Sequence, residues 1–193
     1  MALKIYLAGP DVFLADARRV GQQKQQMCRE LGFEGLFPLD NDAAVGADAA
    51  SIFRANCSLM RQADIGSFNL TPFRGPSADA GTVFELGFLF ARGKPLYGYT
   101  SAVKSYRERL AAAGELHVDP NGQPYDRGGY AVEHFGLSDN LMIVRAIEDS
   151  GGVITAVEEK TGEASTSLAA FQAFKACLKI ISERIKPADV RRA

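Results

Sequence analysis

Short apolar runs alternate with longer amphipathic stretches along most of the chain. The short runs are rich in β-branched and aromatic residues and end at glycine, proline or aspartate, which is typical of buried strands. The stretches between them repeat apolar positions at helical spacing. Strands are predicted at residues 3–8, 33–39, 64–70, 94–100 and 152–157. Helices are predicted at residues 15–31, 47–63, 104–113, 137–146 and 165–185, with a further central helix between residues 77 and 94.

This alternation predicts one α/β domain spanning residues 1–193. Strand–helix–strand units make right-handed crossovers, so the five strands should form a parallel, doubly wound sheet of flavodoxin-like order with helices on both faces. Ligands of such sheets bind at the carboxyl ends of the strands. Residues 101–136 interrupt the pattern with the glycine- and proline-rich segment HVDPNGQPYDRGGY, which predicts a lid or an oligomer-contact loop.

The central stretch, residues 73–97, reads FRGPSADAGTVFELGFLFARGKPLY and holds two carboxylates. Pro72 and Pro76 prevent regular structure before about residue 77, so Asp79 should lie in a loop or cap and Glu85 in the first helical turns. The two carboxylates can therefore converge on one cleft. Apolar residues cover nearly the whole circumference of this helix, which predicts that it is mostly buried and that a charge on Glu85 needs a reason.

Two structural interpretations compete with a functional one for these carboxylates. Thr82 and Glu85 have the spacing of a capping box, and Asp79 alone could be an N-cap. Gly81 and Gly87, on either side of Glu85, favour a pocket because they would allow a ligand to approach the backbone closely.

Three other polar positions have both a structural and a ligand-binding interpretation. Tyr6 lies near the end of the first strand, where core packing is the simplest interpretation. The trio Asp40-Asn41-Asp42 follows the second strand and either forms a turn or faces a ligand. Asn56 lies on a helical face with apolar neighbours, so its amide must find partners, and a pocket is one place to find them.

The composition excludes several classes of function. The chain carries 22 basic and 23 acidic residues, which argues against nucleic acid or an anionic membrane as the partner and favours a small substrate. Cys28, Cys57 and Cys177 are widely spaced with no CxxC, as expected for reduced thiols in the cytoplasm. With only His117 and His134, a metal site is not expected. No signal peptide or membrane-spanning segment is predicted.

Four segments together resemble the nucleoside 2-deoxyribosyltransferase family. They are KIYLAGPDVF, FPLDN, NLTPFRGPSADAGTVFELGFLFARGKPLYGY and FGLSDNLM, and they occur in the family's order between residues 4 and 144. Four motifs in the correct order are far more specific than any one of them. The resemblance implies a flavodoxin-like fold and a pentosyltransferase that exchanges the purine or pyrimidine base of a 2′-deoxynucleoside. It implies no metal, redox cofactor or bound nucleotide.

The resemblance also assigns catalytic roles. Glu85 would be the nucleophile that forms a covalent deoxyribosyl ester, in a retaining double displacement. Asp79 would be the general acid that protonates the departing base, and Tyr6 would hold Glu85 by a hydrogen bond. In a partly desolvated site the two carboxylates should have different pKa values, with Glu85 ionised and Asp79 available as the acid.

Binding residues follow from the same resemblance. Asn140 would reach from a neighbouring subunit to the hydroxyl groups of the sugar, so an obligate homo-oligomer, a dimer or larger, is expected. Where certain members have an aspartate on the second helix, this chain has Asn56, which can orient the sugar or base but cannot exchange a proton. The other substrate-binding positions implied are Gly9, Phe13, Asp40 and Met142, with Phe13 and Asp40 lining the base pocket.

Two rival functions share this scaffold. In a 2′-deoxynucleoside or 5′-monophosphate N-glycosidase, water instead of a second base would resolve the ester. Asp139 beside Asn140 disfavours a phosphate, whereas Ser138 and Arg145 favour one. A non-catalytic sensor of a nucleoside or nucleotide derivative is the third possibility, but a sensor would gain nothing from the combination of Glu85, Asp79 and Tyr6.

Overall fold

The computed structural model describes residues 2–40, 48–157 and 166–185, and the side chains of 166–169 are not described. The described residues form a five-stranded, fully parallel sheet in the order β2-β1-β3-β4-β7. This is the predicted flavodoxin-like order, and the fold class is confirmed. The strands are β1 (Lys4–Ala8), β2 (Glu34–Leu36), β3 (Ile65–Asn69), β4 (Leu96–Thr100) and β7 (Ile154–Ala156).

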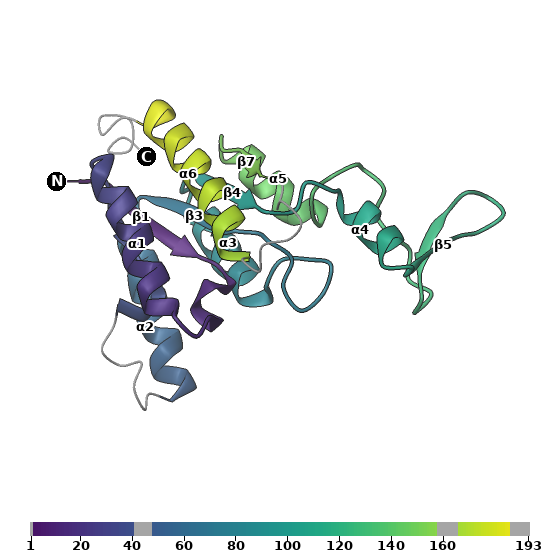
Figure 1. Cartoon of the computed structure of the whole chain (residues 1–193), viewed down its shortest axis with the longest axis horizontal. Coiled ribbons are helices and arrows are strands. Elements are labelled where there is room, and N and C mark those ends of the chain that lie inside the picture. The colour runs from purple at the N-terminus through teal and green to yellow at the C-terminus, as the bar shows by residue number, and fades with distance from the viewer. Residues whose placement is uncertain (1, 41–47, 158–165, 186–193) are drawn as a thin grey trace.

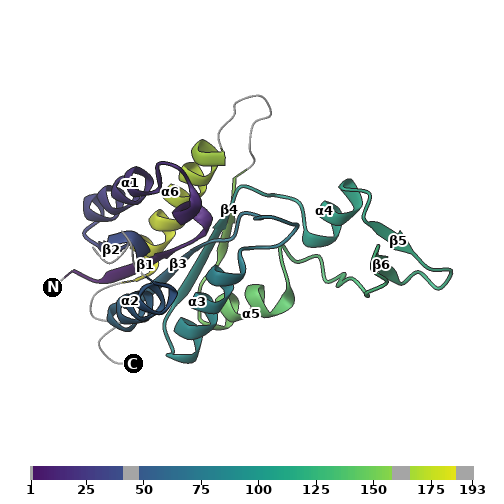
Figure 2. The same ribbon diagram turned by 90° about the horizontal axis from the view of Figure 1, so that it is seen from below.

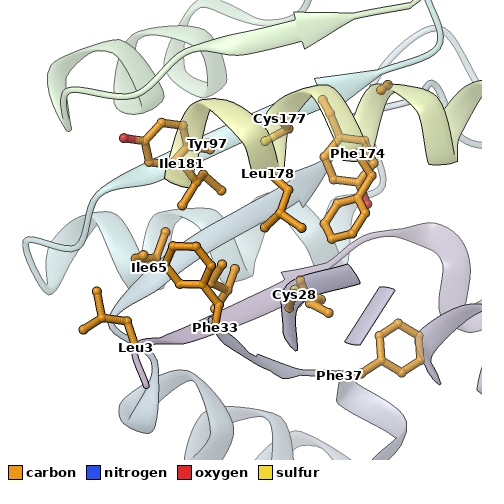
Figure 3. Close-up of a cluster of buried hydrophobic side chains, with 14 residues drawn as sticks. Leu3, Cys28, Phe33, Phe37, Ile65, Tyr97, Phe174, Cys177, Leu178 and Ile181 are labelled. Carbon is orange, nitrogen blue, oxygen red and sulfur yellow. The ribbon is translucent and has the colours of Figure 1, made fainter. Parts of the chain in front are cut away.

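Helices cover both faces of the sheet, as Figures 1 and 2 show. On one face α1 (Ala17–Glu30) and α6 (Thr166–Arg184) pack on the strands, and Figure 3 shows Cys28, Phe174 and Cys177 in this core layer. On the other face lie α2 (Ala49–Gln62), α3 (Ala80–Ala91) and α5 (Leu141–Asp149). Within the described residues, no helix has the length and apolar character needed to cross a membrane.

Period-two alternation along β1 places neighbouring side chains on opposite faces of the sheet. Ile5 and Leu7 join the core under α1 and α6, whereas Tyr6 and Ala8 join the core under α2 and α3. Tyr6 therefore points toward the helix that carries Glu85.

Several element boundaries differ from the prediction. The second strand ends at Leu36, and a 3₁₀ turn, η2 (Pro38–Asp40), follows it. Helix α5 begins at Leu141, four residues later than predicted, because the Asn140 side chain caps it by accepting a hydrogen bond from the amide of Met142. Residues 41–42, 47 and 165, named in the sequence predictions, lie outside the described residues.

Residues 101–140 form an arm that extends from the body of the domain (Figures 1 and 2). The arm contains α4 (Tyr106–Ala112) and an antiparallel hairpin of β5 (Leu116–Val118) and β6 (Pro124–Asp126). The loop predicted at residues 101–136 therefore contains a short hairpin, and its role as a lid or an oligomer contact stays a prediction. Asp119 organises the hairpin turn, since its carboxylate accepts hydrogen bonds from the backbone amides of Asn121 and Gln123.

The prediction that α3 is mostly buried was also wrong. Leu86 and Leu89 face the core, but Phe84 is 52% exposed and Phe90 is 42% exposed. The helix packs on the sheet, α2 and α5 through only part of its circumference, which leaves an apolar surface uncovered.

Candidate active site

The centre of the site is a hydrogen bond between β1 and α3. The Tyr6 hydroxyl donates to Oε1 of Glu85 over 2.6 Å. Tyr6 is fully buried and Glu85 is half-buried in the second turn of α3. This is the contact that the resemblance implied, and it fixes the position of the carboxylate from the sheet.

Asp79 starts the same helix as its N-cap. Its Oδ2 accepts hydrogen bonds from the backbone amide of Thr82 over 2.9 Å and from the Thr82 hydroxyl over 3.1 Å. The alternative capping box between Thr82 and Glu85 is therefore wrong, because α3 begins three residues earlier than that motif requires. Among the described residues no donor contacts Oδ1 of Asp79, so one carboxylate oxygen is available to a ligand.

Burial changes the acid–base behaviour of the central pair. The pKa of Glu85 is raised to about 7, and desolvation is the largest cause. The hydrogen bond from Tyr6 lowers this pKa, whereas the charge of Asp79 raises it. The two carboxylates are therefore close enough to interact. Burial and the negative charge of Glu85 raise the pKa of Tyr6 far above its ordinary value, so Tyr6 stays protonated and remains a donor.

The raised pKa bears on the expected division of roles. Glu85 is expected to be ionised as the nucleophile, and a pKa of about 7 makes that form harder to reach than in an ordinary glutamate. The physical reason is that a carboxylate on this helix loses more hydration than a single phenol hydroxyl restores.

The loop after β1 supplies a flat aromatic surface. Phe13, at the end of η1 (Pro10–Phe13), stacks on Phe73 with ring centroids 5.1 Å apart and ring planes 11° apart. The Arg74 guanidinium lies 4.6 Å from the Phe73 ring centroid. Phe13 is 56% exposed, so the stacked pair can offer an aromatic face to a planar ligand.

Gly9 allows this loop to leave the sheet. It is buried, and a Cβ atom at this position would lie 2.5 Å from Cβ of Asn69 and 2.8 Å from Oδ2 of Asp11. No larger residue fits without moving these neighbours.

A cavity of about 190 Å³ lies beside this loop. Asp11 and Asn69 line it, and the Asn69 amide donates to Oδ2 of Asp11 over 3.0 Å. The same oxygen forms a buried ion pair with Lys24 Nζ at 2.7 Å. Sequence reasoning missed this pair because Lys24 lies in the polar run QQKQQ of α1, which gives no sign that its side chain is buried against Asp11. The remaining lining residues are Pro10, Phe13, Leu14, Thr71, Pro72, Phe73 and Ala170.

Two predicted binding residues, Asp40 and Asn56, differ in whether their side-chain oxygens are already hydrogen-bonded. Asp40 accepts hydrogen bonds from the Phe37 amide over 2.8 Å and from Gln25 Nε2 over 2.6 Å, which makes it the organiser of η2. Asn56 lies on α2, and its Oδ1 is buried without a hydrogen-bond partner among the described residues. An unpaired buried acceptor is costly, so a donor from a ligand would be stabilising there.

Asn140 and Met142 lie at the start of α5, on a different surface. Asn140 Nδ2 donates to Oε1 of Glu133 over 2.8 Å, and Met142 is 71% exposed. Both line a groove of about 610 Å³ between α3 and α5, and Glu85 does not line this groove. The structure therefore does not bring Asn140 and Glu85 into one cavity of a single chain. The other lining residues are Ser77, Ala80, Val83, Leu86, Gly87, Phe90, Ile143, Arg145, Ala146 and Asp149.

The fold and these residues define a class of protein. Two interacting carboxylates lie at the cap and in the second turn of a helix that packs on a flavodoxin-like sheet, and an aromatic surface lies in the loop after the first strand. Paired carboxylates are the usual means of cleaving a glycosidic bond, and an aromatic surface suits a planar base. This is an α/β protein with the groups needed to act on nucleosides.

The comparison with known families identifies it further. The sequence model of the nucleoside 2-deoxyribosyltransferase family matches residues 5–142, and the chain belongs to this family of enzymes that act on nucleosides. An uncharacterized protein of Schizosaccharomyces pombe is 33% identical over 167 residues, which cover 78% of this chain and 79% of that protein.

Solved structures agree with the fold. A 2-deoxyribosyltransferase from Leishmania mexicana is 25% identical with a TM-score of 0.65, and the match covers 95% of this chain and 99% of that one. A conserved protein from Enterococcus faecalis, 21% identical with a TM-score of 0.56, shares the fold over 96% of this chain and all of its own.

Proposed function

We propose that this protein is a nucleoside 2-deoxyribosyltransferase that exchanges the base of 2′-deoxynucleosides through a covalent ester on Glu85. The observation that carries the proposal is the Tyr6–Glu85 hydrogen bond next to Asp79, the N-cap of the same helix. Family membership supports the substrate class.

In the first step an oxygen of ionised Glu85 attacks C1′ of the sugar. The bond between C1′ and the base nitrogen breaks, its electron pair goes to the base, and Asp79 gives the base a proton. The products are a deoxyribosyl ester on Glu85, a free base and the Asp79 carboxylate. A sugar without a 2′-hydroxyl reaches an oxocarbenium-like transition state easily, which suits a carboxylate nucleophile.

In the second step a nitrogen of the incoming base attacks C1′. The ester bond breaks, its electron pair returns to the Glu85 carboxylate, and Asp79 takes the proton that the incoming base loses. Two displacements retain the configuration at C1′. The Tyr6 hydroxyl stabilises the Glu85 carboxylate before the first displacement and after the second.

The substrate positions follow from the same geometry. The Phe13 ring would stack on the base, and Gly9 would let the sugar approach the end of β1. The unpaired Oδ1 of Asn56 would accept a hydrogen bond from a donor on the sugar or base. Asp40 would border the base pocket while it holds η2.

We further propose a homo-oligomer in which Asn140 and Met142 of one subunit complete the site of another. The groove between α3 and α5, with Phe90 and Met142 exposed in its lining, offers an apolar surface for a second copy. Asn140 Nδ2 keeps one N–H beyond its contact with Glu133, which a sugar hydroxyl could accept.

Mixing two inactive variants tests this arrangement. Glu85→Gln and Asn140→Ala should each lose activity alone, and their mixture should recover about a quarter of the wild-type rate if dimers assort at random. Recovery is expected because each mixed dimer has one site in which both Glu85 and Asn140 are intact. An active monomer in sedimentation at micromolar concentration, or no recovery after verified subunit exchange, contradicts the shared site.

The pH profile tests the role of Glu85. With 7-methyl-2′-deoxyguanosine, a donor whose base needs no proton to leave, the first step depends on the ionisation of Glu85 alone. Since the pKa of Glu85 is raised to about 7 and the nucleophile must be ionised, kcat/KM for this donor should rise roughly tenfold per pH unit below about pH 6 and level off above about pH 8. Tyr6→Phe removes a bond that stabilises the ionised form, so it should move the inflection to higher pH. A rate that falls through the same window would make Glu85 the proton donor.

The function itself is tested by incubating the protein with a 2′-deoxynucleoside, with and without a second free base, and separating the products. A new deoxynucleoside that forms only with the second base supports transfer. Free base and deoxyribose accumulating in both reactions would make the protein a hydrolase. No turnover of any nucleoside or nucleotide would favour a sensor.

A further inference from the structure

A buried carboxylate that the catalytic scheme does not use lies next to the site. Asp139 is 2% exposed and directly precedes Asn140. Its Oδ2 accepts a hydrogen bond from the amide of Ala78 over 3.0 Å, and its Oδ1 accepts from the Ser77 hydroxyl and, over 2.8 Å, from the amide of Asn140. One side chain thus joins the start of α5 to the two residues that precede Asp79.

Arg109, on α4 of the arm, contacts the same segment. Its Nε donates to the carbonyl of Pro76 over 2.8 Å, and its Nη1 donates to the carbonyl of Lys104 over 2.6 Å. Its Nη2 lies 3.6 Å from Oδ2 of Asp139, with both side chains largely buried. Arg109 and Asp139 together therefore form hydrogen bonds with three consecutive residues, 76–78.

These contacts have a direct consequence for Asp79. Residues 76–78 are not part of a helix or strand, and among the described residues one backbone hydrogen bond, from the Phe73 amide to the Ser77 carbonyl, holds them. Asp79 is the next residue, and its carboxylate position depends on where this segment enters α3. A loop that leads into a helix cap would otherwise move more freely than the helix itself.

We propose that Arg109 and Asp139 are positioning residues that hold the Asp79 carboxylate in place for proton transfer and, through Asn140, link that position to the arm. The catalytic part of this inference depends on the proposed function, because it takes Asp79 to be the acid. The positional part depends only on the contacts of residues 76–78.

A purely stabilising ion pair is the competing explanation. It would lower the amount of folded protein and affect every substrate equally. A positioning pair should instead affect only those reactions in which Asp79 transfers a proton. A donor whose base leaves without protonation separates the two. 7-Methyl-2′-deoxyguanosine is such a donor because its base already carries a positive charge.

The first measurement is amide hydrogen exchange, which needs no activity. Asp139→Asn keeps the shape of the side chain but places an amide NH₂ group opposite hydrogen-bond donors. If this variant does not fold, Ser77→Ala is used instead, because it removes only one of the contacts of Asp139. Faster exchange in residues 77–82, with the sheet unchanged, supports the proposal. Unchanged exchange in that segment in a folded variant overturns it, whatever the protein catalyses.

The second measurement compares kcat/KM for 2′-deoxyadenosine and 7-methyl-2′-deoxyguanosine. Asp139→Asn and Arg109→Lys should lose ~10- to 10²-fold on the first donor, the loss expected from small misplacement of a reacting group. They should lose less than about threefold on the second, where the acid is not needed. Arg107→Gln, on the same helix, is the control for a change of charge in the arm.

Equal losses on both donors would overturn the proposal in favour of general stabilisation. A wild-type protein that turned over neither donor would refute the proposed function. Hydrogen exchange would then still decide whether the pair positions residues 76–79.

Discussion

Glu85→Gln is expected to lower the rate of base exchange by ~10³-fold or more while the chain remains folded. Glutamine cannot form the ester with C1′, and removal of a covalent nucleophile has effects of this size or larger in other enzymes. The glutamine carbonyl can still accept the hydrogen bond from Tyr6, so the packing around position 85 should survive. Initial rates with a deoxynucleoside donor and a free base measure the loss.

The same variant should be more stable than the wild type at high pH. The pKa of Glu85 is about 7 in the folded chain and near its ordinary value of 4.5 when unfolded. The folded state therefore binds this proton more tightly, and wild-type stability should fall as pH rises from about 4.5 to above 7. Glutamine removes this effect. Its melting temperature should exceed that of the wild type at pH 8, and the difference should shrink toward pH 4.5.

Two further measurements complete this test. Mass spectrometry of the intact wild-type chain, mixed with donor and no acceptor, should show a deoxyribosyl adduct that Glu85→Gln lacks. Glu183→Gln on α6, which changes an exposed carboxylate in a surface ion pair, should alter neither rate nor adduct. A Glu85→Gln variant that kept its rate and lost stability at every pH would show that Glu85 has only a structural role.

Asp79→Asn is expected to lower kcat/KM by ~10²- to 10⁴-fold with 2′-deoxyadenosine, the usual contribution of a positioned general acid. With 7-methyl-2′-deoxyguanosine the loss should be small, because the leaving base needs no proton. Asparagine caps helices about as well as aspartate, so the hydrogen bond from the Thr82 amide should remain. This substitution therefore separates proton transfer from capping.

Asp79→Ala is the matched comparison. It loses the cap as well, at a cost of about 0.5–2 kcal/mol in the free energy of unfolding, which chemical denaturation can measure. If Asp79→Asn lost equal activity on both donors, the acid would have to be another group. If it lost stability like Asp79→Ala but kept its rate, Asp79 would be only a cap.

Some site predictions relied on the resemblance instead of on the residue pattern. On pattern alone, Tyr6 is a core tyrosine, and only its place in the KIYLAGPDVF motif pointed to Glu85. The structure contains that contact because β1 is adjacent to β3 in the sheet and Tyr6 faces α3. The carboxylate pair was predicted from the residue pattern alone, since Pro76 and the apolar run after Gly81 indicate where a helix begins.

The sequence by itself determined the features that depend on neighbours along the chain. Alternating strands and helices predicted the parallel sheet and its order, because crossover handedness and short connections leave few other arrangements. Local spacing also indicated Asp79 as a candidate N-cap, because a cap depends on residues only three positions away.

Only the tertiary structure decided the features that depend on burial and long-range contact. Lys24 and Arg109 look like solvated charges in the sequence, yet each lies buried beside an aspartate 13 or 30 residues away. The raised pKa of Glu85 comes from desolvation by parts of the fold distant in sequence. Hydrophobic periodicity does not indicate which side chains from different elements contact one another, because those contacts depend on how whole elements pack.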